Sequence, residues 1–179
     1  QQQQLQASWK NLNRSLNNLG AISSQQGNLS YVGKPNAYQV NLNTQLLTTK
    51  TPVGDWQLQA KGNTQQLNIE HLVYQGQAGG VNAQGQLSWQ QGLQLQGQFA
   101  VQDFRGDFWL PTWPTQLSGQ SQIQLNINKN QKDITLSDSQ LIGLVKNRAF
   151  NLKTDLLAID LQTLLAKKVP NFNNQQTQI

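Results

Sequence analysis

The sequence predicts a mainly β fold in which long antiparallel strands form a curved, open trough, with one N-terminal amphipathic helix. Three observations support this prediction. Apolar and polar residues alternate over most of the chain, short turns separate the alternating stretches, and only the first twenty residues follow a helical period. We therefore divide the 179 residues into a helix over residues 1–20, a trough-shaped sheet segment over residues 21–172 and a disordered tail over residues 173–179.

The helix is predicted from the spacing of large apolar residues near the N-terminus. Five of them recur at intervals of four and three residues, which would place them on one helical face: Leu5, Trp9, Leu12, Leu16 and Leu19. Gly20 follows at once, and glycine is common where helices end. We expect this helix to cap a core, because Lys10 and Arg14 are its only charges and membrane-surface helices usually carry more.

From residue 25 onward the period changes from about 3.6 residues to 2. Strict alternation gives each strand one buried face and one wet face, as in antiparallel sheets. The alternating apolar residues, strand by strand, are Tyr38, Val40, Leu42 and Leu46; Trp56, Leu58 and Ala60; Leu67 and Ile69; Val81, Ala83, Leu87 and Trp89; Leu93, Leu95, Phe99 and Val101; Leu117, Ile123, Leu125 and Ile127; Ile134 and Leu136; and Phe150, Leu152, Leu156 and Ala158.

Residues 103–114 interrupt the alternation with aromatic residues and prolines. Pro111 and Pro114 cannot donate a ladder hydrogen bond, which excludes a central strand. We expect a short helical turn or corner that starts near Asp103. Its aromatic residues would plug an end of the sheet, or act as a lid for a ligand or partner: Phe108, Trp109 and Trp113.

The composition excludes several classes of function. Charged residues make up 12% of the chain, and the polar surface is supplied mainly by 33 Gln and 19 Asn. The net charge of +5 comes from Lys and Arg that are almost all isolated, so we expect no nucleic acid partner. There is no apolar run of 18 residues and no signal peptide, and we expect the chain to be a piece of a longer protein.

The sequence offers little catalytic chemistry. It contains no cysteine, one histidine (His71) and one glutamate (Glu70). His71 falls in an alternating stretch, and the pairs Asp103/Asp107 and Asp133/Asp138 lack the apolar surroundings that raise a carboxyl pKa. We therefore predict no catalytic residue, no metal site, no cofactor and no enzyme activity.

The apolar face of the sheet is the remaining candidate site, because one short helix could not cover so many strands. Either the sheet closes on itself, or the apolar face remains available to a hydrocarbon ligand. We predict a lipid-binding groove lined by Val40, Leu42, Leu58, Leu87, Leu95, Phe99, Leu125 and Leu152.

Two motifs resemble the TamB family, within the AsmA-like superfamily. They are Gly85-x-Leu87-x-Trp89-x-x-Gly92-Leu93-x-Leu95-x-Gly97-x-Phe99, and Trp109-Leu110-Pro111-x-Trp113-Pro114 followed by Leu117-x-Gly119. The similarity extends more loosely from Tyr31 to Leu157, about three quarters of the chain.

The resemblance implies a long periplasmic β-taco in Gram-negative bacteria, anchored in the inner membrane by a helix outside this chain. It also implies three partners: a TamA-like outer-membrane barrel, phospholipid acyl chains and unfolded outer-membrane proteins such as autotransporters. We expect this piece to come from the C-terminal half of such a protein.

The sequence is compatible with three functions. The first is a conduit for phospholipid, and the second is an interaction module whose strand edges pair with the barrel or with client proteins. The third is a self-contained lipid carrier with a closed barrel, which the irregular strand lengths disfavour.

Overall fold

The computed structural model describes residues 3–16, 20–48, 52–108, 114–128 and 132–160, which form ten strands and one short helix. The strands are β1 (Gln3–Leu16), β2 (Gly20–Lys34), β3 (Ala37–Thr48), β4 (Gly54–Gly62), β5 (Gln66–Gly76), β6 (Gly79–Ser88), β7 (Leu93–Arg105), β8 (Thr115–Ile127), β9 (Lys132–Val145) and β10 (Arg148–Asp160); the 3₁₀ helix η1 (Gly106–Phe108) follows β7.

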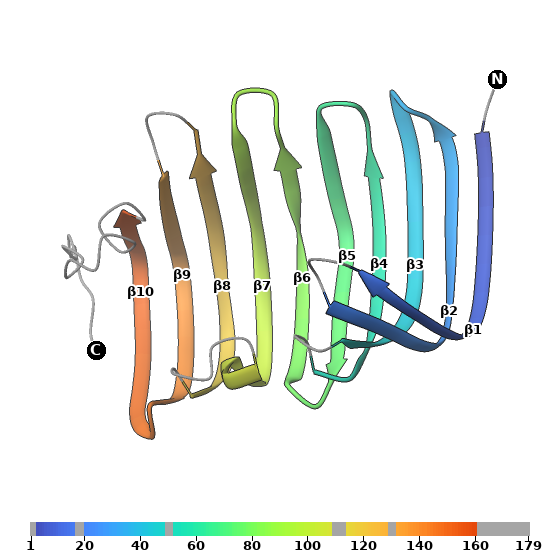
Figure 1. Cartoon of the computed structure of the whole chain (residues 1–179). Helices are drawn as coiled ribbons and strands as arrows, with labels where there is room; N and C mark the ends of the chain where they lie inside the picture. The colour runs from blue at the N-terminus through green and yellow to red at the C-terminus, as the bar shows by residue number, and fades with distance from the viewer. Residues whose placement is uncertain (1–2, 17–19, 49–51, 109–113, 129–131, 161–179) are drawn as a thin grey trace.

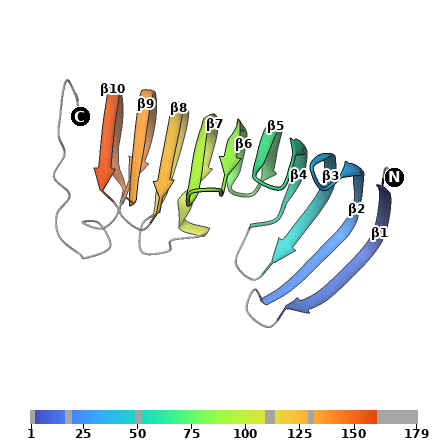
Figure 2. The ribbon, with the colours of Figure 1, turned by 90° about the horizontal axis from the view of Figure 1, so that it is seen from above.

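All ten strands belong to one antiparallel sheet, and each strand pairs with its neighbours in the sequence (Figure 1). Seen from above, they follow one another in a single layer (Figure 2). The order runs from β1 to β10, and β1 and β10 do not pair with each other, so the sheet is open. The predicted mainly β fold of long antiparallel strands is confirmed, and a closed barrel is excluded for the described residues.

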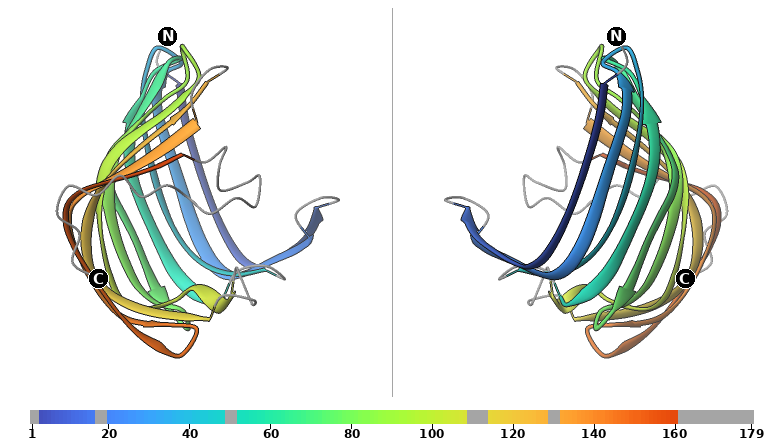
Figure 3. Two further views of the ribbon diagram at one scale, coloured as in Figure 1. Left: turned by 90° about the vertical axis from the view of Figure 1, so that its left-hand side faces the viewer. Right: turned by 90° about the vertical axis from the view of Figure 1, so that its right-hand side faces the viewer.

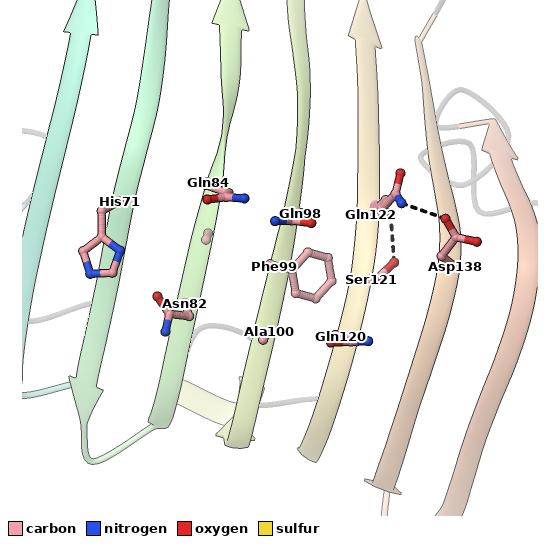
Figure 4. Close-up of a pocket in the computed structure, with 11 residues that line it drawn as sticks. His71, Asn82, Gln84, Gln98, Phe99, Ala100, Gln120, Ser121, Gln122 and Asp138 are labelled. Atoms are coloured by element: carbon pink, nitrogen blue, oxygen red, sulfur yellow. Dashed lines mark hydrogen bonds between the residues drawn. The ribbon is translucent and has the colours of Figure 1, made fainter.

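The strands bend in one direction along their length, which gives the sheet a concave and a convex face (Figure 3). Figure 1 is viewed from the side toward which the strands bend. In Figure 4 the strands β5 to β9 run from left to right, the reverse of their order in Figure 1, so Figure 4 is viewed from the other side. The side chains in front in Figure 4 include His71, Gln84 and Gln98, so the polar face is convex. The apolar residues alternate with these and lie on the concave face.

Irregular positions shift the alternation within several strands. The pairing of β8 with β9 changes register between Gln120 and Gln122, and that of β7 with β8 changes between Val101 and Phe104. Asp138 and Asp103 lie at these two positions and have φ of 48°, in the left-handed region that Asp tolerates better than most residues. Such bulges increase the local twist and bend of a strand.

The predicted N-terminal helix is wrong for the described residues. Gln3–Leu16 form β1, which pairs with β2 from Gln3↔Gly33 to Leu16↔Gly20. The intervals of four and three residues are also compatible with a strand that changes direction, and Asn11 has φ of 53° in the middle of β1. The long partner β2 then decides the outcome, because pairing satisfies the backbone groups that β1 turns toward β2 along almost its whole length.

The last strand also differs from the prediction, in which Phe150, Leu152, Leu156 and Ala158 shared one face. Leu152 pairs with Leu141, whereas Leu157 pairs with Leu136 and Leu156 pairs with Ser137. The concave residues after the irregularity near Asp155 are therefore Leu157 and Ile159. Leu156 is 53% exposed and lies on the convex face.

The turn predicted near Asp103 is present, although β7 first continues to Arg105. Helix η1 follows, and the Gly106 N–H donates a 2.9 Å hydrogen bond to Oγ1 of Thr115 in β8. The guanidinium of Arg105 lies 5.1 Å from the ring centroid of Phe108 and forms an ion pair with Asp107 at 2.8 Å. Trp109, Trp113 and the predicted tail over residues 173–179 lie outside the described residues.

One buried tyrosine joins two connections at the same end of the sheet. Tyr74 in β5 is 1% exposed, and its ring centroid lies 4.7 Å from that of Trp56. Its hydroxyl donates to the Val53 carbonyl at 3.2 Å and accepts from the Ala78 N–H at 3.1 Å. The β3–β4 and β5–β6 connections are thereby fixed to each other.

Candidate functional site

The apolar side chains of the concave face stand opposite one another in rows that cross the sheet. Residues directly opposite in an antiparallel pair point to the same face, with Cβ atoms about 5 Å apart. One row runs Leu29–Leu42–Leu58–Leu72–Ala83–Phe99, a second Tyr31–Val40–Ala60–Ile69, and a third Leu67–Leu87–Leu95–Leu125–Ile134–Ile159.

All eight residues predicted to line a groove lie on this face. Seven occur in the three rows above, and Leu152 pairs with Leu141, which in turn pairs with Gly119. Leu152 is buried, and the other seven are half-buried. The structure therefore brings the predicted residues together on one surface, while lipid contact with them stays a prediction.

No second layer of described strands or helices covers the concave face, and its side chains bury one another. Leu141, Leu152 and Leu157 are 6–7% exposed and form a core cluster over β9 and β10. Phe99 and Val101 of β7 pack against the same cluster. They reach it across β8, where Gly119 and Ser121 are small. The C-terminal part of the concave face is thus the best packed.

Two groups of buried hydroxyls interrupt the apolar surface where the strands are irregular. Ser121 and Ser139 are 1–2% exposed, their Oγ atoms lie 2.6 Å apart, and Ser121 also donates to the Gln122 carbonyl at 2.8 Å. At the other end, Ser24 accepts from Trp9 Nε1 at 2.8 Å and lies 2.9 Å from Thr44 Oγ1. Because these hydroxyls have partners, they cost little in an apolar setting.

A pair of glycines leaves the middle of the concave face without side chains. Gly85 of β6 stands opposite Gly97 of β7, between Ile69 and Ile123 in the neighbouring strands. A Cβ added to Gly85 would lie 2.7 Å from the Gly97 Cα, closer than real Cβ contacts. Only glycine permits this approach of the two backbones.

Hollows between side chains occur on the convex face, where the curvature spreads the side chains apart. One of them has a volume of about 310 Å³ and is lined by residues of five strands, among them Ala100 of β7 (Figure 4). Amides of β6, β7 and β8 surround it. The periodicity of the sequence does not predict this hollow, although one signal is present: Ala100 interrupts a face that is otherwise rich in Gln and Asn.

The chain matches the family model for the N-terminal domain of TamB over residues 3–176. It belongs to the TamB family. No solved structure matches it. The matched model describes the N-terminal domain, which contradicts the C-terminal position expected from the sequence. Within the described residues of this TamB-family chain, no helix is both long and apolar enough to cross a membrane.

The described residues of this TamB-family chain contain no cluster of three or more His, Asp or Glu side chains that could hold a metal ion. His71 is exposed on the convex face of β5. Asp103 and Asp138 occupy the irregular strand positions described above, where they accept hydrogen bonds from Gln116 and Gln122. These carboxylates have structural roles, and the absence of enzyme activity stays a prediction.

Proposed function

We propose that this TamB-family chain is a segment of a periplasmic, envelope-spanning protein whose concave face carries phospholipid between the inner and outer membranes. This transport would support the assembly of outer-membrane proteins, including autotransporters, without catalysis. One observation carries the proposal: apolar rows cross the open sheet, and no described element covers them. Acyl chains are the ligand that such a surface suits.

The energetics are compatible with transport. Burying an acyl chain of about 15 methylenes is worth roughly 12 kcal/mol at about 0.8 kcal/mol per methylene. A lipid leaving a bilayer loses a similar amount, so its transfer onto an apolar face is close to neutral. A surface of this kind lowers the barrier to transfer without trapping the lipid.

Lipid extraction tests the proposal. The chain, purified from bacterial envelopes, should yield phospholipid by mass spectrometry. Leu95→Arg places a charge on the concave face and should reduce the yield, whereas Gln96→Arg places the same charge on the convex face of the same strand. Equal lipid yields from the two folded variants would contradict a conduit on the concave face.

The alternative is an interaction module that pairs strand edges with a TamA-like barrel or with unfolded outer-membrane clients. The edge strands favour it: β1 and β10 are long, and neither has a second described neighbour. Exposed edges bind extended segments by adding a strand. In this case a photo-crosslinker at Leu5, which is 56% exposed on β1, should trap protein, and lipid extraction should find none.

A further inference from the structure

The cavity of about 310 Å³ on the convex face extends across five strands, β5 to β9. His71 of β5 lies at one end and Asp138 of β9 at the other (Figure 4). Ala100 lies between them, opposite Asn82 on one side and Gln120 on the other. Its short side chain leaves a hollow that longer amides surround.

A row of three glutamines forms one wall of this cavity. Gln84, Gln98 and Gln122 stand opposite one another on β6, β7 and β8. The same three residues line a second hollow of about 440 Å³ on their other side, toward Gln96 and Glu70. The convex face thus has two adjacent hollows separated by a ridge of amides, both running across the strands.

The amides around Ala100 have unused hydrogen-bonding groups. Within the described part of the chain, the side chains of Asn82, Gln84, Gln98 and Gln120 form no hydrogen bond with one another or with other residues. Elsewhere on this face two pairs of amides do bind each other, Asn43 with Asn28 at 3.4 Å and Gln86 with Gln66 at 3.1 Å. Each unpaired amide offers two donors and an acceptor to a ligand.

We propose that this cavity binds a neutral, linear glycan. A sugar ring has hydroxyls around its edge, which suit amides that both donate and accept, and C–H groups on its faces, which suit the Ala100 methyl group. No Lys or Arg lines the cavity, and the Asp138 carboxylate disfavours an anionic ligand. The two hollows beside one ridge favour a chain of several sugars over a single one.

Other ligand classes fit less well. An acyl chain would have to cover amides without replacing their hydrogen bonds to water, which is costly. An extended peptide would need free backbone groups, but β5 to β9 are each paired on both sides. The glycan site is independent of the proposed lipid face, because the two lie on opposite faces of the sheet.

Titration of the ¹⁵N-labelled chain with chitohexaose tests the proposal, since NMR resolves the NH₂ signals of Asn and Gln side chains. We expect saturable shifts at Asn82, Gln98 and Gln120. Ala100→Leu fills the hollow at an exposed strand position that accepts large residues, and it should weaken binding by about tenfold or more. Gln59→Ala, on the same face outside the cavities, is the matched control and should bind as the unmodified chain does.

Three outcomes would overturn the proposal: no shifts at saturating chitohexaose, equal binding by the folded Ala100→Leu variant, or shifts confined to the concave face. An uncharged Gly-Ser peptide provides a further comparison. Binding of this peptide as tightly as chitohexaose would reject the assignment to a glycan. None of these results depends on whether lipid occupies the concave face.

Discussion

Removing the hydroxyl of Tyr74 should destabilise the sheet more than removing the hydroxyl of any other tyrosine in the chain. Tyr74→Phe removes the donor to the Val53 carbonyl and the acceptor of the Ala78 N–H. The Val53 carbonyl keeps a second partner, because it also accepts from the Gln77 N–H at 3.0 Å. The Ala78 N–H has no such replacement, and Ala78 is 0% exposed.

The expected cost follows from this difference. An unsatisfied buried donor costs about 1–3 kcal/mol, and a satisfied hydrogen bond contributes about 1 kcal/mol net. We therefore expect Tyr74→Phe to lower the free energy of unfolding by about 2 kcal/mol. For a chain of 179 residues, this corresponds to a fall in Tm of roughly 4–8 °C.

Urea unfolding followed by tryptophan fluorescence measures the effect, since Trp56 packs against Tyr74. Tyr38→Phe is the matched control: the Tyr38 ring stacks on Tyr31 at 5.5 Å, and within the described residues its hydroxyl has no hydrogen bond. We expect the control to change stability by less than about 0.5 kcal/mol. Equal effects of the two substitutions would refute the role assigned to the buried hydroxyl.

Three further predictions test the two faces. Leu152→Ala removes a side chain that is 6% exposed and should lower the free energy of unfolding in urea by about 2 kcal/mol. Leu156→Ala removes a side chain of the same strand that is 53% exposed and should lower it by about 1 kcal/mol. The reverse order would contradict the assignment of the two faces. Leu95→Arg should leave the fold intact, because a long side chain can extend from an open face, yet abolish function of the full-length protein; normal envelope integrity with this variant would count against the conduit. His71→Ala should change stability by no more than about 1 kcal/mol and still complement a deletion strain; failure by a folded, abundant variant that still binds chitohexaose would point to catalysis.

The alternation of apolar residues was sufficient to predict the strands and their faces from β3 to β8. Val40, Leu58 and Leu95 lie on the predicted face because side chains in a strand alternate with period two, whatever the neighbouring strands do. The curvature was also anticipated, although the bulges at two aspartates were not. The bulges at Asp103 and Asp138 depend on pairing between strands, which the sequence of either strand alone does not reveal.

The N-terminus shows a different limit. Leu5, Trp9 and Leu12 fit a helical face by spacing, yet their segment pairs with β2 along its whole length. The spacing of residues within one segment contains no information about the stabilisation that a second strand provides by pairing with it. The cavity at Ala100 was missed for a related reason: an alanine in a polar row becomes a hollow only when amides on neighbouring strands surround it.

Photo-crosslinking in intact cells shows directly whether phospholipid contacts the concave face. Leu95 and Leu125 form a cross-strand pair on the concave face, and Gln96 and Gln124 form the neighbouring pair on the convex face. With a photo-reactive amino acid at each position of the full-length protein in turn, we expect phospholipid adducts at the two leucine positions and none at the two glutamine positions. Adducts of equal yield on both faces, or protein adducts alone at the leucine positions, would contradict it.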